Sequence, residues 1–370
     1  MTILVICSFA PSLWLFRGHL LRILTDRGYS VIACGPGGNI EASKRLEEMG
    51  VKWCPVKMNS GGMNPISDLK LLCQLRRIIE KYSPEIVFNY TIKPVIYGSM
   101  AASKCFVPRI YSMITGRGYC FMQNSLKQRL IGFVASCLYK MALRCNRRVI
   151  FQNIDDMELF LTKRIIKDRN DAVLVNGSGI DLKHFAQSEI RMHQPLFLLV
   201  ARLYREKGVQ EFVMAATTIK ERHPEARFRI VGSIADNPSG FSPTIINQWK
   251  KQGIIEHVEW VDDVRPHLNE STVYVLPSYC EGLPRSVLEA MASGRPIVTT
   301  DAPGCRETVE EGVNGFLVPA RDYKILSNRM ERFITDPGLA KKMGMESRRI
   351  AEDRFDVELV TQQMIQALEI

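Results

Sequence analysis

The chain has 370 residues, of which 46% are hydrophobic and 24% charged, and its 49 Lys and Arg outnumber 39 Asp and Glu to give a formal net charge of +10. This length exceeds what one hydrophobic core usually covers, so we expect two domains that each bury a full sheet. The sequence has no run of about 18 or more uncharged apolar residues, which excludes a bilayer-spanning helix. Excess positive charge suits nucleic acid or an anionic surface, but no nucleic-acid-binding motif accompanies it, so we expect no nucleic-acid partner.

The amino-terminal residues 1 to 7 are apolar, with no basic flank before them and no small-residue cleavage site after them. They predict a strand and not a signal peptide. Ten cysteines are scattered along the chain without any Cys-x2-Cys pair. This pattern favours reduced thiols in a cytoplasm over a disulfide framework or a zinc site.

Apolar strands alternate with helical patterns along the chain, which indicates a parallel α/β architecture. In the first half, the predicted strands lie near residues 2 to 7, 30 to 34, 51 to 57, 85 to 90, 109 to 113 and 148 to 152. In the second half, they lie near residues 196 to 201, 227 to 232, 257 to 261, 272 to 277 and 296 to 300. We place the domains at 1–190 and 191–355, and expect residues 356–370 to form a terminal helix with an apolar stripe.

Two glutamates flank a strand-to-helix junction in the second domain. The strand ends near Pro277, and a helix is predicted between Pro284, which suits a first helical position, and Gly294, which suits the residue after the end. Glu281 then lies in the loop and Glu289 on the helix. By spacing alone, these could equally be solvated surface charges.

The first turn of this helix is a predicted anion site. We expect free backbone N–H groups at Arg285, Ser286 and Val287, between the two carboxylates, with the helix dipole adding positive potential. A diphosphate could bind there while Glu281 and Glu289 accept hydrogen bonds from hydroxyls.

Two cations follow the first predicted strand of the second domain, again between the end of a strand and the start of a helix. The strand 196–201 precedes Arg202 and Lys207, and a helical segment begins at Val209. Open α/β sheets bind ligands at the carboxyl ends of their strands, so both cations are placed to contact phosphate oxygens. An Arg-x4-Lys-Gly loop upstream of a Glu-x7-Glu element favours nucleotide-sugar binding over ordinary surface charge.

With these motifs the chain resembles the family-4 retaining glycosyltransferases of the GT-B fold, in which two Rossmann-like domains face each other across a cleft. The resemblance covers nearly the whole chain and is strongest from about 170 to 320. It implies that Arg202 and Lys207 neutralise the donor diphosphate, that Glu289 holds the ribose and that Glu281 contacts the transferred sugar. Gly232 is included in the predicted donor site. The resemblance also suggests that the terminal helix crosses back onto the first domain.

The acceptor is expected to bind the first domain. Loops follow the fourth and fifth predicted strands, and they resemble those of bacterial transferases that elongate undecaprenyl-diphosphate-linked saccharides. Lys93 lies in the first loop, and Thr115-Gly116-Arg117-Gly118 in the second. Both cations would suit an acceptor's diphosphate, and both glycines allow close backbone approach. These could also be ordinary turn and surface residues.

Positive charge is concentrated in residues 86 to 154, which contain ten Lys or Arg and no Asp or Glu. Within them, apolar residues with near-helical spacing run from Leu126 to Met141 beside the four cations Lys127, Arg129, Lys140 and Arg144. Such a helix suits an anionic membrane surface, although it could also be a core helix. We expect peripheral attachment to the inner face of the cell membrane.

The chain departs from the family pattern in its first domain. None of its six His falls between 20 and 183, and the first strand is not followed by a Gly-Gly pair. No catalytic base is therefore named, which is compatible with a retaining mechanism in which the leaving diphosphate accepts the acceptor's proton. Asp262 and Asp263 favour a turn or cap over a metal site, so we expect neither metal nor cofactor.

The sequence thus predicts a GT-B glycosyltransferase that moves a sugar, preferably an N-acetylhexosamine, from a UDP donor to a lipid-linked saccharide of a surface polysaccharide. Two alternatives stay open. One is a GT-B sugar-nucleotide 2-epimerase, for which no acidic and basic constellation is evident. The other is a catalytically silent sugar-nucleotide-binding subunit, against which the intact motif residues argue.

Overall fold

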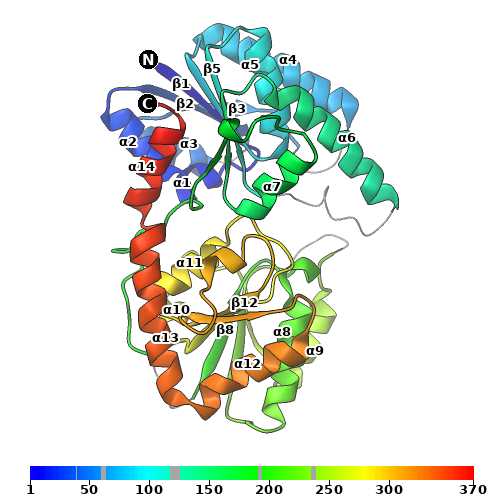
Figure 1. The fold of residues 1–370 in the computed structure, drawn as a ribbon, viewed down its shortest axis with the longest axis vertical. Helices are drawn as coiled ribbons and strands as arrows, with labels where there is room; N and C mark the ends of the chain where they lie inside the picture. Colours follow the sequence, from blue (N-terminus) through cyan, green and yellow to red (C-terminus); the bar gives the residue numbers. More distant parts are fainter. Residues whose placement is uncertain (39, 60–63, 117–125, 191–193, 235–238) are drawn as a thin grey trace. The chain divides into compact units, whose positions relative to one another are not determined.

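The computed structural model describes residues 1–38, 40–59, 64–116, 126–190, 194–234 and 239–370. They form two compact units, the first made of Met1–Ser178 with Glu358–Ile370 and the second of Gly179–Val357 (Figure 1). Each unit is a parallel sheet with helices on both faces, so the predicted α/β class is confirmed.

Unit 1 contains a seven-stranded parallel sheet in the order β3-β2-β1-β4-β5-β6-β7. Its strands are β1 (Thr2–Ile6), β2 (Ser30–Pro36), β3 (Lys52–Val56), β4 (Ile86–Tyr90), β5 (Arg109–Ile114), β6 (Arg148–Phe151) and β7 (Ala172–Leu174). Its helices are α1 (Ser12–Leu15), α2 (Gly18–Asp26), α3 (Ile40–Glu47), α4 (Pro65–Tyr82), α5 (Ser99–Lys104), α6 (Leu126–Leu143), α7 (Ile154–Thr162) and the carboxyl-terminal α14 (Val357–Ala367). The short edge strand β7 was not predicted.

Unit 2 contains a six-stranded parallel sheet in the order β10-β9-β8-β11-β12-β13. Its strands are β8 (Leu196–Val200), β9 (Arg227–Val231), β10 (Glu256–Val258), β11 (Val273–Leu276), β12 (Ile297–Thr300) and β13 (Gly315–Val318). Its helices are α8 (Val209–Lys220), α9 (Pro243–Lys251), α10 (Arg265–Glu270), α11 (Arg285–Ala292), α12 (Tyr323–Thr335) and α13 (Pro337–Ile350). The edge strand β13 was also missed.

Alternation along the strands explains why both faces of each sheet are covered. In β8, Phe197 and Leu199 pack into a core with α8, whereas Leu198 packs on the opposite face with Leu288 of α11. Successive side chains of a strand point to opposite faces, so a continuously apolar strand requires helices on both sides. This geometry fixes α8 and α11 on opposite faces with their first turns beside the carboxyl ends of the strands.

The change of unit occurs between Ser178 and Gly179, whereas the predicted boundary lay near 190. Residues up to 190 stay with unit 2, where a buried and a half-buried arginine bind their carbonyl groups. Arg295 donates to Ser188 O at 2.9 Å, and Arg348 donates to Phe185 O at 2.9 Å. The connecting segment is thus hydrogen-bonded to unit 2 before β8 begins.

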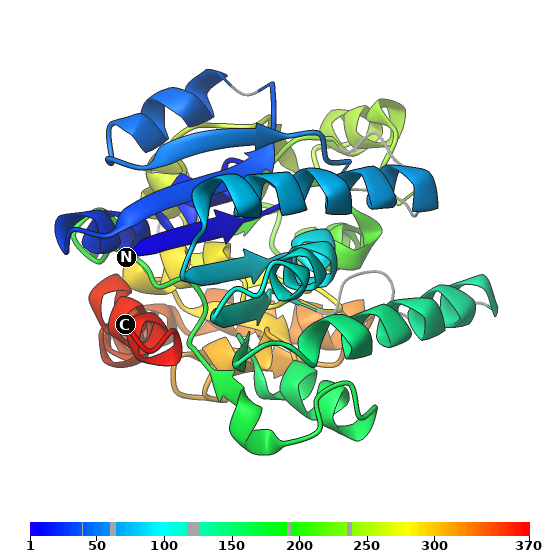
Figure 2. The same ribbon diagram turned by 90° about the horizontal axis from the view of Figure 1, so that it is seen from above.

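The carboxyl-terminal segment packs in unit 1, and both chain ends lie there (Figures 1 and 2). Met364 and Ile365 of α14 join the core on the face of the sheet that α2 covers. Glu369 then accepts a hydrogen bond from Tyr111 at 3.0 Å and forms an ion pair with Arg148 at 3.0 Å. Apolar packing and these polar contacts together hold the last helix on the first sheet.

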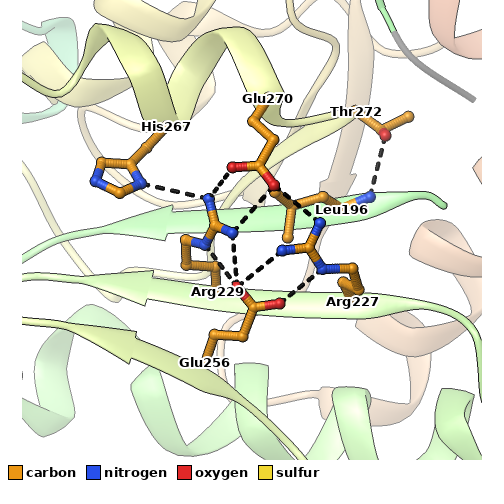
Figure 3. Close-up of polar contacts among 7 residues, drawn as sticks. All are labelled: Leu196, Arg227, Arg229, Glu256, His267, Glu270 and Thr272. Carbon is orange, nitrogen blue, oxygen red and sulfur yellow. Dashed lines mark hydrogen bonds and ion pairs between the residues drawn. The ribbon is translucent and has the colours of Figure 1, made fainter.

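A charged network crosses the amino-terminal ends of the strands of unit 2 (Figure 3). Arg227 and Arg229 of β9 lie between Glu256 of β10 and Glu270 at the end of α10. Arg227 Nε contacts Glu256 Oε1 at 2.7 Å, and Arg229 Nη1 contacts Glu270 Oε2 at 2.5 Å. His267 Nδ1 lies 3.3 Å from Arg229 Nη1. This edge is opposite to the carboxyl ends of the strands, so the network serves stability.

We expect Glu270→Gln to lower thermal stability at neutral pH and to flatten its pH dependence in acid. Hydrogen bonds from Arg229 lower the pKa of Glu270 from 4.5 to about 2. Because the folded pKa is depressed, the stabilisation is present above the unfolded pKa and is lost as pH falls through about 2. Thermal unfolding across a pH series measures the effect. Glu259→Gln, at an exposed carboxylate, is the control, and equal curves for the two variants would contradict the role.

Candidate functional site

The predicted donor residues of unit 2 gather at the carboxyl ends of β8 and β11. These strands are neighbours at the point where the strand order reverses. Ligands of open α/β sheets bind outside the strand ends at such a point. Arg202 and Lys207 follow β8, Glu281 follows β11, and Glu289 lies on α11. The sequence therefore brings the four side chains to one edge of one sheet.

Lys207 and Glu281 form an ion pair, with Lys207 Nζ 2.5 Å from Glu281 Oε1. Both side chains are largely buried, since 26% of Lys207 and 14% of Glu281 is exposed. Lys207 ends the short turn Arg205–Lys207 before α8. The structure thus joins a predicted phosphate-binding cation directly to the predicted sugar-contacting carboxylate, a contact between two residues 74 positions apart.

Backbone and side-chain hydrogen bonds fix these two loops against each other. The carbonyl oxygen of Glu206 accepts from Tyr279 N–H at 2.9 Å and from Ser278 Oγ at 3.1 Å. Tyr279 O–H donates to Glu211 Oε1 of α8 at 2.7 Å. Burial and the Glu211 carboxylate raise the pKa of Tyr279, so the hydroxyl keeps its proton. The loop that carries Glu281 is therefore attached to the helix that Lys207 precedes.

Three glycines let the backbones of this edge approach closely. An added Cβ would lie 2.0 Å from Pro277 O at Gly208, 2.0 Å from Ala201 O at Gly232 and 2.4 Å from Glu281 O at Gly304. All three have positive φ, of 70°, 152° and 77°. Only glycine meets both requirements without strain. Gly232 is thus explained by its approach to the end of β8, and Gly304 by its approach to the Glu281 loop.

Glu289 is paired with a neighbour on its own helix. Arg285 Nε contacts Glu289 Oε1 at 3.0 Å, and Arg285 Nη1 lies 3.5 Å from Gly179 O. Burial raises the pKa of Glu289, while the nearby guanidinium opposes the shift. Arg285 therefore orients the carboxylate.

The amino end of α11 differs in detail from the expectation. Pro284 precedes the helix as its cap, with φ −74° and ψ 106°. The Val287 N–H, predicted to be free, donates to Pro284 O at 3.0 Å, because the first turn closes on the proline carbonyl. The Ser286 N–H has no hydrogen-bond acceptor among the described residues, so this group stays a candidate anion donor.

Arg202 lies over the ring of Tyr204, with its Cζ 4.9 Å from the ring centroid. Within the described part of the chain, no carboxylate forms an ion pair with Arg202. A guanidinium held by an aromatic face keeps its hydrogen-bond donors for a phosphate. The contact of Arg202 with a donor diphosphate stays a prediction.

We expect Tyr279→Phe to reduce kcat about threefold to thirtyfold with little change in UDP affinity. The loss of one hydrogen bond to a carboxylate loosens the Glu281 loop, whereas α11 is untouched. Steady-state kinetics and calorimetric titration with UDP measure the two effects. Glu211→Gln keeps an acceptor oxygen and should stay close to wild type, and Tyr323→Phe on α12 is the surface control. Equal losses of UDP affinity and kcat would contradict this role for Tyr279.

The first predicted acceptor residue of unit 1, Lys93, is paired with a carboxylate. Lys93, predicted to bind a diphosphate, is buried and its Nζ pairs with Asp68 Oδ1 at 2.8 Å. Asp68 also accepts from Tyr97 O–H at 3.1 Å. The Lys93 ammonium is therefore paired with a carboxylate of α4, and its contact with an acceptor's diphosphate stays a prediction.

The second acceptor loop begins as expected at the end of β5. Thr115 and Gly116 are half-buried there, and Gly116 has φ 128°. Arg117 and Gly118 lie outside the described residues. Their acceptor role stays a prediction.

Of the acidic pair after β10, Asp263 forms its contacts with a residue only two positions further along the chain. Asp263 Oδ1 accepts the Arg265 N–H at 3.0 Å, and its carboxylate pairs with the Arg265 side chain at 2.8 Å. In the described residues, no group of three or more His, Cys, Asp or Glu is arranged to hold a metal ion. Among the helices of those same residues, none has the length and apolar character needed to cross a bilayer.

Sequence reasoning did not identify Tyr279, Glu211 or Gly304 as part of this edge. Tyr279 stands two residues before Glu281, but its partner lies 68 positions away. Gly304 follows Pro303, a turn signal that gave no indication of the contact with Glu281.

Two parallel α/β units of this topology define a protein of the GT-B class, as solved structures show. Sucrose-phosphate synthase from Thermosynechococcus elongatus superposes with a TM-score of 0.82 at 19% identity, covering 100% of this chain and 98% of that one. The Anabaena protein HepE in complex with UDP gives a TM-score of 0.80 at 17% identity and full coverage of both chains.

Two family models match the sequence, one in each unit. Residues 181–350 match "Glycosyl transferases group 1" and residues 5–153 match "Glycosyl transferase 4-like". The chain belongs to this family of glycosyltransferases.

Two curated relatives are similar over most of their length. The N,N'-diacetylbacillosaminyl-diphospho-undecaprenol alpha-1,3-N-acetylgalactosaminyltransferase of Campylobacter jejuni is 27% identical over 369 residues, covering 96% of this chain and 94% of that one. The UDP-Gal:alpha-D-GlcNAc-diphosphoundecaprenol alpha-1,3-galactosyltransferase of Escherichia coli is 27% identical over 307 residues, covering 79% and 77%.

Proposed function

We propose that this glycosyltransferase moves an N-acetylhexosamine from a UDP-sugar to a saccharide carried on a lipid diphosphate, with retention of configuration, in surface polysaccharide or glycan synthesis. The Lys207–Glu281 ion pair before α11 is the observation that carries the proposal, because an ammonium, which is suited to phosphate, lies next to a carboxylate, which is suited to hydroxyls. The two curated relatives support the acceptor class, since both names contain a sugar linked to diphospho-undecaprenol. The Escherichia coli relative's name also contains a UDP-sugar.

In this mechanism, Arg202, Lys207 and the Ser286 N–H stabilise negative charge on the leaving diphosphate. Fixed donors at a site of developing charge commonly contribute factors of about 100 to 1,000 in rate. The acceptor hydroxyl oxygen forms a bond to the anomeric carbon as the bond from that carbon to the diphosphate oxygen breaks. The acceptor's proton passes to the departing diphosphate oxygen. The products are UDP and the extended lipid-linked saccharide, and no cofactor or metal ion is needed.

The two glutamates would divide the recognition of the donor. Glu289 would accept hydrogen bonds from the ribose, while Glu281 would accept one from the transferred sugar and keep Lys207 in place. Lys207 has three N–H donors, so contact with Glu281 leaves it able to bind a phosphate oxygen.

The test is transfer of radiolabel from UDP-, GDP- and dTDP-sugars to membrane lipid acceptors. Transfer from a UDP-N-acetylhexosamine to an organic-extractable lipid, with the new bond shown by NMR to retain the donor's configuration, is the expected result. Conversion of the sugar nucleotide to an epimer without transfer would favour a 2-epimerase. UDP-sugar binding with no turnover against any acceptor would favour a silent subunit.

We also propose an anionic membrane surface as a partner, bound at the cytoplasmic face through α6. This helix projects beyond the neighbouring elements of unit 1 (Figures 1 and 2). One side of it packs through Tyr139 and Ala142. On the other side, Leu130, Phe133 and Met141 are 65%, 68% and 58% exposed. A helix with an unpacked apolar stripe beside several cations is suited to insertion at the lipid headgroup level.

The basic residues beside this stripe provide the second part of the proposal. Arg129 and Arg144 are exposed, Lys140 is half-buried, and the side chain of Lys127 lies outside the described residues. Each cation near an anionic leaflet contributes about 1 kcal/mol, and salt screens the attraction over about 8 Å at physiological ionic strength.

Changing Arg129, Lys140 and Arg144 together to Gln is expected to weaken binding to phosphatidylserine-containing vesicles by about one to two orders of magnitude. Co-sedimentation across a salt series measures this loss, and UDP binding reports folding. The matched control removes equal charge from unit 2 as Lys251→Gln with Lys341→Gln and Lys342→Gln. If wild-type protein does not sediment at low salt, or if both triple variants lose binding equally, the docking surface is wrong.

A further inference from the structure

A cavity of about 580 Å³ opens at the carboxyl ends of β1, β2 and β3 in unit 1, and its lining residues are different from the predicted acceptor residues after β4 and β5. It is lined by the last residue of β2 and by residues that come shortly after the three strands, namely Ser8, Phe9, Ala10, Pro11, Pro36, Gly37, Gly38, Met58 and Asn59. In an open α/β sheet, this edge is where ligands bind.

The chemistry of the lining selects the class of ligand. None of the lining residues is charged, so the cavity offers neither a cation for a phosphate nor a carboxylate for a metal ion. Phe9 nevertheless leaves 52% of its surface exposed. An exposed aromatic ring in a concave site, with hydroxyl, amide and backbone groups around it, suits an uncharged polar ligand with one apolar face. A hexose ring has both properties.

The cavity is built on a strained and well-fixed segment. Thr91, which follows β4, has φ 71°, a region that β-branched residues rarely adopt. Its Oγ1 accepts from Ser8 N–H at 3.1 Å and from Ser8 Oγ at 2.7 Å. Backbone strain of this kind concentrates at functional sites. The contact joins the loop after β1 to the loop after β4, across the point where the strand order of unit 1 reverses.

Two glycines, Gly37 and Gly38, form part of the cavity lining at the end of β2. Gly38 has φ 92°, and among the described residues, its chain neighbours apart, no heavy atom lies within 4 Å of the position that its Cβ would occupy. The Gly37 N–H is bonded to Val56 O at 3.2 Å, which fixes the turn after β2. The turn after β2 therefore contributes backbone groups to the lining of the cavity.

We propose that this cavity binds the uncharged sugar of the acceptor, with the sugar ring lying on Phe9. The inference rests on the proposed function for the identity of the ligand as a lipid-linked saccharide, and it adds which part of that acceptor is recognised and where. Phe9 is then a specificity-determining residue, and the cations that bind the acceptor's diphosphate belong to other loops.

Binding of a saccharide without lipid or diphosphate tests the cavity directly. The probe is methyl N-acetyl-α-D-glucosaminide, observed by saturation-transfer NMR on the full chain. We expect transfer to the probe in wild type, loss of at least three-quarters of it in Phe9→Ala, and retention in Phe9→Trp. Because Phe9 is largely exposed, both variants should fold, which circular dichroism checks. Absent transfer in wild type, or unchanged transfer in Phe9→Ala, overturns the proposal.

Kinetics with a soluble acceptor separate this proposal from the proposed function. With an N-acetylglucosaminyl diphosphate on an eleven-carbon chain, Phe9→Ala should raise the acceptor KM at least tenfold and leave the UDP-sugar KM within twofold. Undecyl phosphate, which lacks the sugar, should not displace the NMR probe. Displacement would show that the cavity binds the alkyl chain. If wild type transfers to no lipid acceptor, the proposed function fails, whereas the NMR result still decides whether the cavity binds a saccharide.

Discussion

Lys207→Ala should lower kcat by one to three orders of magnitude while the fold is preserved. The substitution removes a cation from the leaving diphosphate, an interaction that strengthens as charge develops in the transition state. It also removes the group 2.5 Å from Glu281 Oε1, so the carboxylate that would contact the sugar loses its position. Single-turnover measurement of the transfer step tests this, because product release does not then mask the chemistry.

The chain offers a matched control in the same turn. Arg205 lies two residues earlier, but its guanidinium stacks on Phe241, with Cζ 5.2 Å from the ring centroid. Arg205→Ala should change kcat less than threefold, whereas Arg202→Ala should resemble Lys207→Ala. A Lys207→Ala enzyme with wild-type turnover would remove Lys207 from the mechanism.

The strands with the clearest sequence signal are those buried on both faces. β1 and β8 are continuously apolar because helices cover both sides, and this pattern needs no knowledge of neighbours. β7 and β13 have only three or four residues, and they lie at sheet edges. Three or four apolar residues are too few to show a strand's period, and pairing with β6 and β12 is what makes them strands. Long-range pairing cannot be read from local pattern.

The helix α6 shows a second limit of sequence-based prediction, which is the choice of the side that packs against the rest of unit 1. Its apolar spacing predicts one amphipathic stripe, but the structure buries Tyr139 and Ala142 and exposes Phe133 and Met141. Apolar residues occupy two sides of the helix, so periodicity does not tell which side packs. The exposed side, with Phe133 and Met141, belongs to the apolar stripe that the sequence predicted for a membrane surface.

The predicted donor residues at the carboxyl ends of β8 and β11 form what we call the donor edge. Their proximity could be anticipated, because they follow two adjacent strands and strand order alone brings them together. The ion pair of Lys93 could not be anticipated, because its partner carboxylate, Asp68, lies on α4, 25 residues earlier. Both cations follow strands and look alike in sequence. Only tertiary contacts distinguish Lys93, with a buried structural partner, from Lys207, whose partner belongs to the same site.

Replacing each glutamate of the donor edge should separate nucleotide binding from sugar transfer. Glu289→Ala should weaken binding of free UDP about tenfold to a hundredfold, since a hydrogen bond to a charged group contributes roughly 1.5 to 3 kcal/mol. Glu281→Ala should leave UDP affinity within about threefold and impair transfer, because only the sugar loses its partner. Calorimetric titration with UDP, paired with turnover at saturating donor, distinguishes the two variants.

The pH dependence of UDP binding gives a second readout of the same division. Burial raises the pKa of Glu289, so its carboxylate takes up a proton sooner as pH falls than an exposed glutamate does. UDP affinity in wild type should therefore decline on acidification at a pH above the ordinary titration of glutamate. Glu289→Gln, which keeps one acceptor oxygen, should bind UDP weakly without that decline, whereas Glu281→Gln should retain it. Equal UDP affinities in Glu289→Ala and Glu281→Ala, or an unchanged pH profile in Glu289→Gln, would show that the two carboxylates do not divide the donor between them.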